Sequence, residues 1–175
     1  PNALTTLRIV MVPFFGAALL VDGGDSATWR TVAYVIFALA MITDKIDGDI
    51  ARARNLVTDF GKIADPIADK ALMAAAMISL SLVDELFWWV TIVILVREVG
   101  ITLWRLFGVD HVVAASKGGK LKTVTQTVGL GMLILPLPQW AWPAEWAVVG
   151  VALVLTVYTG IDYLVKARQA ARAGR

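Results

Sequence analysis

Six mostly apolar stretches run along this chain, and they constrain its fold more than any other feature. They cover residues 4–21, 31–50, 61–83, 86–107, 123–135 and 146–165. A helix needs about 20 apolar residues to cross a bilayer, where only helices and closed barrels satisfy the backbone. Composition agrees, because 58% of the 175 residues are hydrophobic and 17% are charged. We predict an all-α integral membrane bundle of six transmembrane helices, forming a single domain over residues 1–175.

The fifth stretch is short, and Pro136 and Pro138 bound it, so we expect its helix to begin earlier, near Lys120. The chain has no cysteine and one histidine, His111, which argues against thiol catalysis, zinc fingers, iron–sulfur clusters and histidine-rich metal sites.

The distribution of charge predicts the orientation. With six crossings, both termini lie on the same side of the membrane. Of the 16 Lys and Arg residues, all except Arg30 are expected on that side as well. Lys and Arg concentrate on the cytoplasmic side of membrane proteins. Tryptophans gather near the opposite ends of the spans, as an interfacial belt does: Trp29, Trp88, Trp89, Trp140, Trp142 and Trp146. We therefore predict a multi-pass membrane protein with both termini on the cytoplasmic side.

Four aspartates stand at the ends of two adjoining stretches, where charge is costly. Asp44 and Asp47 are three residues apart, and Asp65 and Asp69 are four apart, so each pair shares one helix face. The connection between the helices is short, so the two faces can meet. Carboxylates this close cannot all stay ionised without cations. Two divalent ions would supply the charge, and oxygen-only ligands favour hard cations such as Mg²⁺, Mn²⁺ or Ca²⁺.

Small residues beside these carboxylates suggest a phosphorylated substrate. Gly48, Ala51 and Gly61 leave space for a base or a pyrophosphate, and Arg52 could hold phosphate oxygens. Mg²⁺ commonly binds through carboxylates together with substrate phosphates. Displacement at phosphorus fits this arrangement, with one carboxylate taking the proton of an attacking hydroxyl.

These residues form the pattern Asp44-x2-Asp47-Gly48-x2-Ala51-Arg52-x8-Gly61-x3-Asp65-x3-Asp69, which resembles the signature of the CDP-alcohol phosphotransferases at all specified positions. The resemblance implies the fold of that family, a site for two divalent cations, Mg²⁺ or Mn²⁺, and a homodimer. It also implies residue roles. The metal ligands would be Asp44, Asp47, Asp65 and Asp69, with Asp69 also the general base. The residues that bind CDP-diacylglycerol would be Asn2, Thr5, Gly48, Ala51, Arg52, Thr58 and Gly61.

A second block resembles the bacterial phosphatidylglycerophosphate synthases within this family. It comprises Arg97-Glu98, Arg105 and the run Gly119-Lys120-Leu121-Lys122-Thr123-x2-Gln126, and the opening Pro1-Asn2-x-Leu4-Thr5-x2-Arg8 is similar as well. Glycerol 3-phosphate is a dianion, which four aspartates would repel unless cations offset them. We expect the acceptor phosphate to be bound by Arg97, Arg105, Lys120, Lys122 and Arg8.

The expected reaction transfers the phosphatidyl group of CDP-diacylglycerol to the 1-hydroxyl of sn-glycerol 3-phosphate and releases CMP. Other acceptors of the same family stay open, namely inositol 1-phosphate, as in phosphatidylinositol phosphate synthases, and phosphatidylglycerol, as in cardiolipin synthases. A cation or proton transporter is the alternative from another class, because such proteins also carry intramembrane carboxylates. We expect membrane lipids as further partners, and no nucleic acid.

Plainer interpretations remain for several charged residues. Arg8 could be a snorkelling anchor at the interface, and Arg97 could pair with Glu98 and brace a helix. Asp49 points to another helix face than Asp47 and could pair with Lys45. Asp162 is expected to pair with Lys166, four residues later on the same helix.

Overall fold

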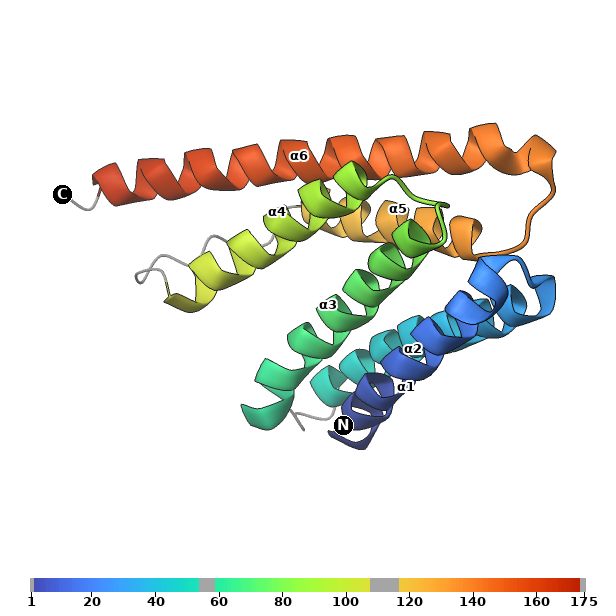
Figure 1. The fold of residues 1–175 in the computed structure, drawn as a ribbon. Coiled ribbons are helices and arrows are strands. Elements are labelled where there is room, and N and C mark those ends of the chain that lie inside the picture. The colour runs from blue at the N-terminus through green and yellow to red at the C-terminus, as the bar shows by residue number, and fades with distance from the viewer. Residues whose placement is uncertain (1, 54–58, 108–116, 174–175) are drawn as a thin grey trace. The chain divides into compact units, whose positions relative to one another are not determined.

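A computed structural model describes the backbone of residues 2–53, 59–107 and 117–173, and the side chains of residues 6–43, 67–103, 120–166, 168 and 169. Within these ranges the protein is helical, without strands, which confirms the predicted all-α class. The elements are α1 (Asn2–Leu20), η1 (Val21–Gly24), α2 (Ala27–Ala53), α3 (Asp59–Leu82), α4 (Trp88–Phe107), α5 (Lys117–Ile134), η2 (Gln139–Ala141) and α6 (Trp142–Ala173) (Figure 1).

Each predicted apolar stretch forms one α-helix, and the differences lie at the ends. The helix α5 begins at Lys117, slightly earlier than the expected Lys120. The helix α6 continues through Ala173, beyond the predicted end at residue 165. The added segment is rich in Ala and Arg, which are strong helix formers, so the helix extends past its apolar part.

The outer faces of the helices carry large apolar side chains. Phe14 on α1, Val96 on α4 and Tyr158 on α6 are each more than 60% exposed. Among the described residues, Thr6–Gly24 and Gln139–Lys166 are long and apolar enough to cross a membrane, and Ala27–Thr43 is a shorter apolar helix. An apolar surface of this extent is unfavourable in water and suits lipid. Six crossings remain a prediction.

The described chain forms two compact units. Unit 1 comprises residues 1–87 and 130–137, and unit 2 comprises residues 88–129 and 138–175, so α5 passes from one unit into the other. In unit 1, α1 packs against both α2 and α3. The rings of Phe15 and Phe37 meet with centroids 5.9 Å apart. Small residues such as Ala33 and Ala76 are fully buried, which lets the helices approach closely.

A tight turn joins α1 and α2. Gly24 has a φ of +87°, a conformation that L side chains rarely adopt. A Cβ at this glycine would lie 2.9 Å from the side chain of Val83, so the turn also packs closely against the end of α3.

Unit 2 is built on α4 and α6, which contact each other near the start of α4 and diverge toward its end (Figure 1). The first part of α5 belongs to the same unit. A Cβ at Gly129 of α5 would lie 3.2 Å from Val149 of α6, so these two helices approach closely at the glycine. On the outer surface of α6, Lys166 Nζ donates a 2.7 Å hydrogen bond to Asp162, which confirms the predicted pair.

Arg30, near the start of α2, donates hydrogen bonds to the last carbonyls of α5 in unit 1. Its Nε donates a 3.1 Å hydrogen bond to the carbonyl of Ile134, its Nη2 donates to the carbonyl of Leu133, and its Nη1 pairs with Glu85. The carbonyls in the last turn of a helix lack N–H partners. Here Pro138, four residues after Ile134, has no N–H to offer. Arg30 supplies the missing donors.

We predict that Arg30→Met destabilises the protein. Losing two hydrogen bonds to helix-terminal carbonyls and leaving Glu85 without its cation should cost about 3 kcal/mol. For a chain of this size, that corresponds to a fall in Tm of roughly 6–12 °C, measured by thermal unfolding in detergent. Arg168→Met, at an exposed position on α6, is the control. Equal shifts for the two variants would contradict the role of Arg30.

Candidate active site

The two halves of the aspartate pattern lie on α2 and α3, near the ends that residues 54–58 connect. Asp47 precedes the end of α2 by six residues, and Asp65 follows the start of α3 by six. At a rise of 1.5 Å per residue, both positions are about 9 Å from those ends, and Asp44 and Asp69 are about 14–15 Å from them. The helices run antiparallel and contact each other (Figure 1). Each aspartate of α2 therefore has a counterpart at a similar level of α3.

The backbone also supports the predicted helix faces. Positions 44 and 47 share a face of α2, and positions 61, 65 and 69 share a face of α3, because these spacings bring residues into register on a helix. Asp69 is the member of the quartet whose side chain falls within the described part of the chain, and it is half buried. The side chains of residues 44–66 lie outside that part.

The first turn of α1 lies at the same end of unit 1 (Figure 1). Asn2 and Thr5 belong to this turn, although their side chains lie outside the described residues. Arg8, the basic residue of α1, is only 1% exposed. A snorkelling arginine keeps its guanidinium in water, so burial argues against the interfacial-anchor interpretation.

The residues at this end of unit 1 fit divalent cations by their chemistry. Four carboxylates at matching levels of two contacting helices supply the oxygen ligands that hard cations prefer. In the part of the chain with described side chains, His, Cys, Asp and Glu form no group of three. The side chains of Asp44, Asp47 and Asp65 lie outside that part.

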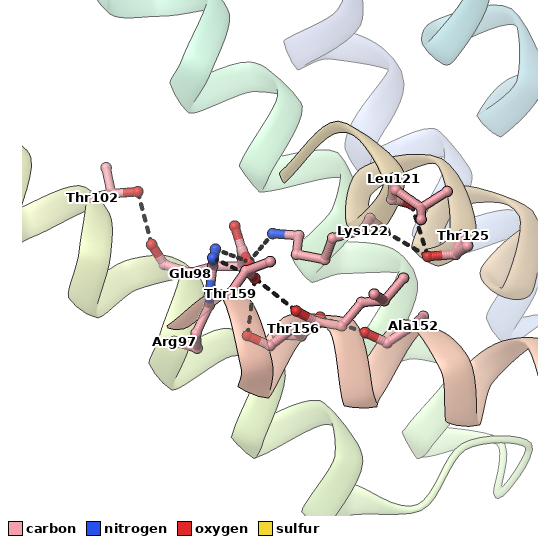
Figure 2. A network of polar contacts seen from close by, with 10 residues as sticks. Arg97, Glu98, Thr102, Leu121, Lys122, Thr125, Ala152, Thr156 and Thr159 are labelled. Atoms are coloured by element: carbon pink, nitrogen blue, oxygen red, sulfur yellow. Dashed lines mark hydrogen bonds and ion pairs between the residues drawn. The ribbon is translucent and has the colours of Figure 1, made fainter. Parts of the chain in front are cut away.

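Glu98 is the centre of a second polar cluster, in unit 2 (Figure 2). Its Oε1 accepts a 3.0 Å hydrogen bond from Arg97 Nη1 and also pairs with Lys122 Nζ. Arg97 Nη2 donates a 2.9 Å hydrogen bond to Thr159 Oγ1 of α6. The side chains of Arg97 and Glu98 are at most 20% exposed, and that of Lys122 is 6% exposed. The predicted pairing of Arg97 with Glu98 is confirmed.

The remaining predicted residues fall into three groups. Lys120 of α5 is exposed and therefore accessible to a ligand in solution. Gly48, Ala51 and Arg52 lie on α2, Gly61 on α3 and Arg105 on α4, each in a part of its helix without described side chains. Thr58 lies outside the described residues.

Comparison with known families decides the chain's affiliation. The family model for CDP-alcohol phosphatidyltransferase matches residues 1–158, across both units. The chain belongs to this family. CDP-alcohol phosphatidyltransferases are membrane-associated and generally depend on divalent metal, in agreement with the apolar helices and the aspartate quartet.

Curated relatives of this CDP-alcohol phosphatidyltransferase cover nearly the whole chain. A probable phosphatidylglycerophosphate synthase of Mycobacterium tuberculosis is 48% identical over 167 residues, covering 95% of this chain and 80% of that protein. The CDP-diacylglycerol--glycerol-3-phosphate 3-phosphatidyltransferase of Bacillus subtilis is 37% identical, covering 95% and 93%. The protein of that name from Escherichia coli K12 is 38% identical, covering 96% and 94%.

The structure adds residues that the sequence analysis did not consider as part of a site. Thr159 of α6 contacts Arg97 although the two are 62 residues apart in the chain. Gly160, next to it, lies against the stem of the same arginine. The helical spacing of small and polar residues on α6 was a signal, but only the pairing of α6 with α4 identifies their partner.

We predict that Asp44→Ala and Asp65→Ala each weaken Mn²⁺ binding by at least about tenfold, since even the loss of residues that support a metal ligand has effects of this size. The measurement is titration of the purified protein in detergent, with free Mn²⁺ followed by electron paramagnetic resonance. Asp49→Ala is the matched control, because position 49 is rotated by about 200° from position 47 around α2. The ligand assignment would be contradicted if Asp49→Ala weakened Mn²⁺ binding while Asp44→Ala and Asp65→Ala bound Mn²⁺ as the wild type does.

Proposed function

We propose that this protein transfers the phosphatidyl group of CDP-diacylglycerol to the 1-hydroxyl of sn-glycerol 3-phosphate, forming phosphatidylglycerophosphate and CMP. The observation that carries the proposal is the match to three bacterial relatives named for this reaction or its product, at 37–48% identity over at least 95% of this chain. Family membership also argues against a cation or proton transporter.

In the proposed reaction, the carboxylate of Asp69 accepts the proton of the glycerol 1-hydroxyl. The hydroxyl oxygen then forms a bond to the β-phosphorus of CDP-diacylglycerol, and the bond from this phosphorus to the bridging oxygen breaks. CMP leaves with the electron pair. The half-buried position of Asp69 on α3 supports this role, because the packed helix limits the movement of the side chain while part of the side chain stays accessible to a substrate hydroxyl.

Asp44, Asp47, Asp65 and Asp69 would hold two divalent cations, Mg²⁺ or Mn²⁺. Bound there, such cations neutralise the diphosphate and stabilise the charge that develops on CMP. Around them, the nucleotide and its diphosphate would be bound by Asn2, Thr5, Gly48, Ala51, Arg52, Thr58 and Gly61. The common end of α1, α2 and α3 in unit 1 supports this grouping (Figure 1).

The acceptor phosphate would be bound by Arg97, Arg105, Lys120, Lys122 and Arg8. Two of these cations, Arg97 and Lys122, pair with Glu98, so one carboxylate is shared by two cations among the residues drawn in this cluster (Figure 2). The excess of positive charge favours a phosphorylated acceptor over a neutral alcohol.

We further propose six crossings of the bacterial plasma membrane, with both termini and the active site on the cytoplasmic side. The positive charge of the corresponding helix ends supports this orientation. Membrane lipids surround the helices, residues 1–175 act as one domain, and the protein assembles as a homodimer. The family resemblance is the basis for the homodimer.

The direct test supplies radiolabelled CDP-diacylglycerol to the purified protein together with one of three acceptors. We expect labelled product with sn-glycerol 3-phosphate, and with neither inositol 1-phosphate nor phosphatidylglycerol. Thin-layer chromatography separates the products, and CMP release provides a second readout. A product formed only with another acceptor would contradict the proposed substrate, and no CMP release with any of them would contradict the reaction class.

We predict that Asp69→Asn lowers kcat by about 10²–10⁴-fold, the usual contribution of a general base. The amide oxygen remains able to bind a cation, so Mn²⁺ affinity should change much less than kcat. Asp162→Asn, which removes the exposed pair with Lys166, is the control and should keep wild-type kcat. Near-normal turnover in Asp69→Asn would exclude the role of Asp69 as the base.

A further inference from the structure

Two neighbouring residues of α6 fix the position of Arg97 in unit 2. Thr159 contacts the end of the arginine side chain, and Gly160 lies beside its stem. Neither residue carries a charge, and neither belongs to the set proposed above to bind a substrate. Both are buried, so their contacts with Arg97 are made inside the protein.

The hydroxyl oxygen of Thr159 is placed to accept a hydrogen bond from the guanidinium of Arg97. Its hydroxyl hydrogen is directed back to its own helix, with the carbonyls of Leu155 and Thr156 at 2.7 and 3.2 Å. The oxygen lone pairs remain to accept a hydrogen bond, and Arg97 Nη2 donates one at 2.9 Å. A hydroxyl engaged in this way is a fixed acceptor, which orients the plane of the guanidinium (Figure 2).

Gly160 provides the space that the arginine stem occupies. A Cβ at this position would lie 3.1 Å from Arg97 Cγ and 3.5 Å from Nε. Because Cγ is close to the backbone of α4, the stem cannot yield easily by rotating its far end. Even an alanine at position 160 would therefore require the stem of Arg97, or the two helices, to shift by a few tenths of an ångström.

The contacts of Arg97 leave some N–H groups of its guanidinium available to bind a ligand. Nε is buried and has no hydrogen-bond acceptor among the described residues. Nη1 donates to Glu98 and Nη2 to Thr159. An arginine carries two N–H groups on each terminal nitrogen, so each keeps one N–H that no described residue engages. N–H groups on the two terminal nitrogens of one guanidinium can bind the oxygens of a phosphate.

The geometry points to Thr159 and Gly160 as positioning residues, which hold Arg97 so that its two remaining N–H groups bind the phosphate of the acceptor. The inference rests on the proposed function, in which Arg97 binds this phosphate. Thr159 acts by orienting the guanidinium, and Gly160 by admitting the stem. Since the acceptor phosphate does not react, its binding is the same in the ground state and in the transition state. Misplacement of Arg97 should therefore raise KM for glycerol 3-phosphate and leave kcat almost unchanged.

The test compares two glycines of the same helix. Gly160→Ala should raise KM for glycerol 3-phosphate by about tenfold, since small displacements of a positioning group have effects of this order. KM for CDP-diacylglycerol should stay within about twofold of the wild-type value. Gly150→Ala is the matched control, because a Cβ at Gly150 meets nothing within 4 Å. It should leave both KM values unchanged.

Substitutions of Thr159 test the same inference without added bulk. Thr159→Val keeps the shape and removes the acceptor, and it should raise KM for glycerol 3-phosphate by about tenfold, the usual effect of losing a hydrogen bond to a charged group. Thr159→Ser restores the hydroxyl and should restore the wild-type KM. A purely structural role would instead lower Tm and change both KM values together in the valine and serine variants alike.

Measuring the wild-type protein in the same assay distinguishes the proposed function from the positioning role of Thr159 and Gly160. Failure of the wild type to use glycerol 3-phosphate would contradict the proposed function itself. Normal wild-type kinetics with an unchanged acceptor KM in both Gly160→Ala and Thr159→Val would contradict only the positioning role of α6.

Discussion

A charged side chain inside an apolar bundle of helices needs an opposite charge or a polar backbone group, and this requirement organises both units. In unit 1, Arg30 combines a carboxylate with two helix-terminal carbonyls. In unit 2, Glu98 is shared by Arg97 and Lys122. The first arrangement joins α2 to the end of α5, and the second joins α4 to the start of α5. The charges therefore define which helices pair, in addition to any chemistry that they perform.

The cluster around Glu98 combines two roles that the sequence presented as alternatives. Pairing of Arg97 with Glu98 braces α4, and the same pairing leaves an excess of positive charge. A carboxylate that is shared by two cations compensates only part of their charge. We therefore regard the brace and the proposed anion site as one arrangement, in which Glu98 stabilises the cations that an anionic substrate would need.

Much of the fold was accessible from the sequence, because local patterns determined it. Apolar stretches predicted the helices, and the four-residue spacing predicted the pair of Asp162 and Lys166. The aspartate spacing predicted the faces on α2 and α3 that the helical backbone supports. Contacts between distant segments were not accessible in this way. Arg30 binds the carbonyl of a residue 104 positions away, and no side-chain pattern marks a backbone oxygen as its partner.

The end of α5 has a consequence for how the protein is made. The prolines that follow α5 supply no amide hydrogen at their own positions. The last carbonyls of α5 instead accept hydrogen bonds from an arginine of α2. The helix α2 leaves the ribosome about a hundred residues earlier than the end of α5. During synthesis, the newly made segment would find its terminal donors already present in the nascent protein. An isolated α5 peptide would lack them, and its final turn would unravel.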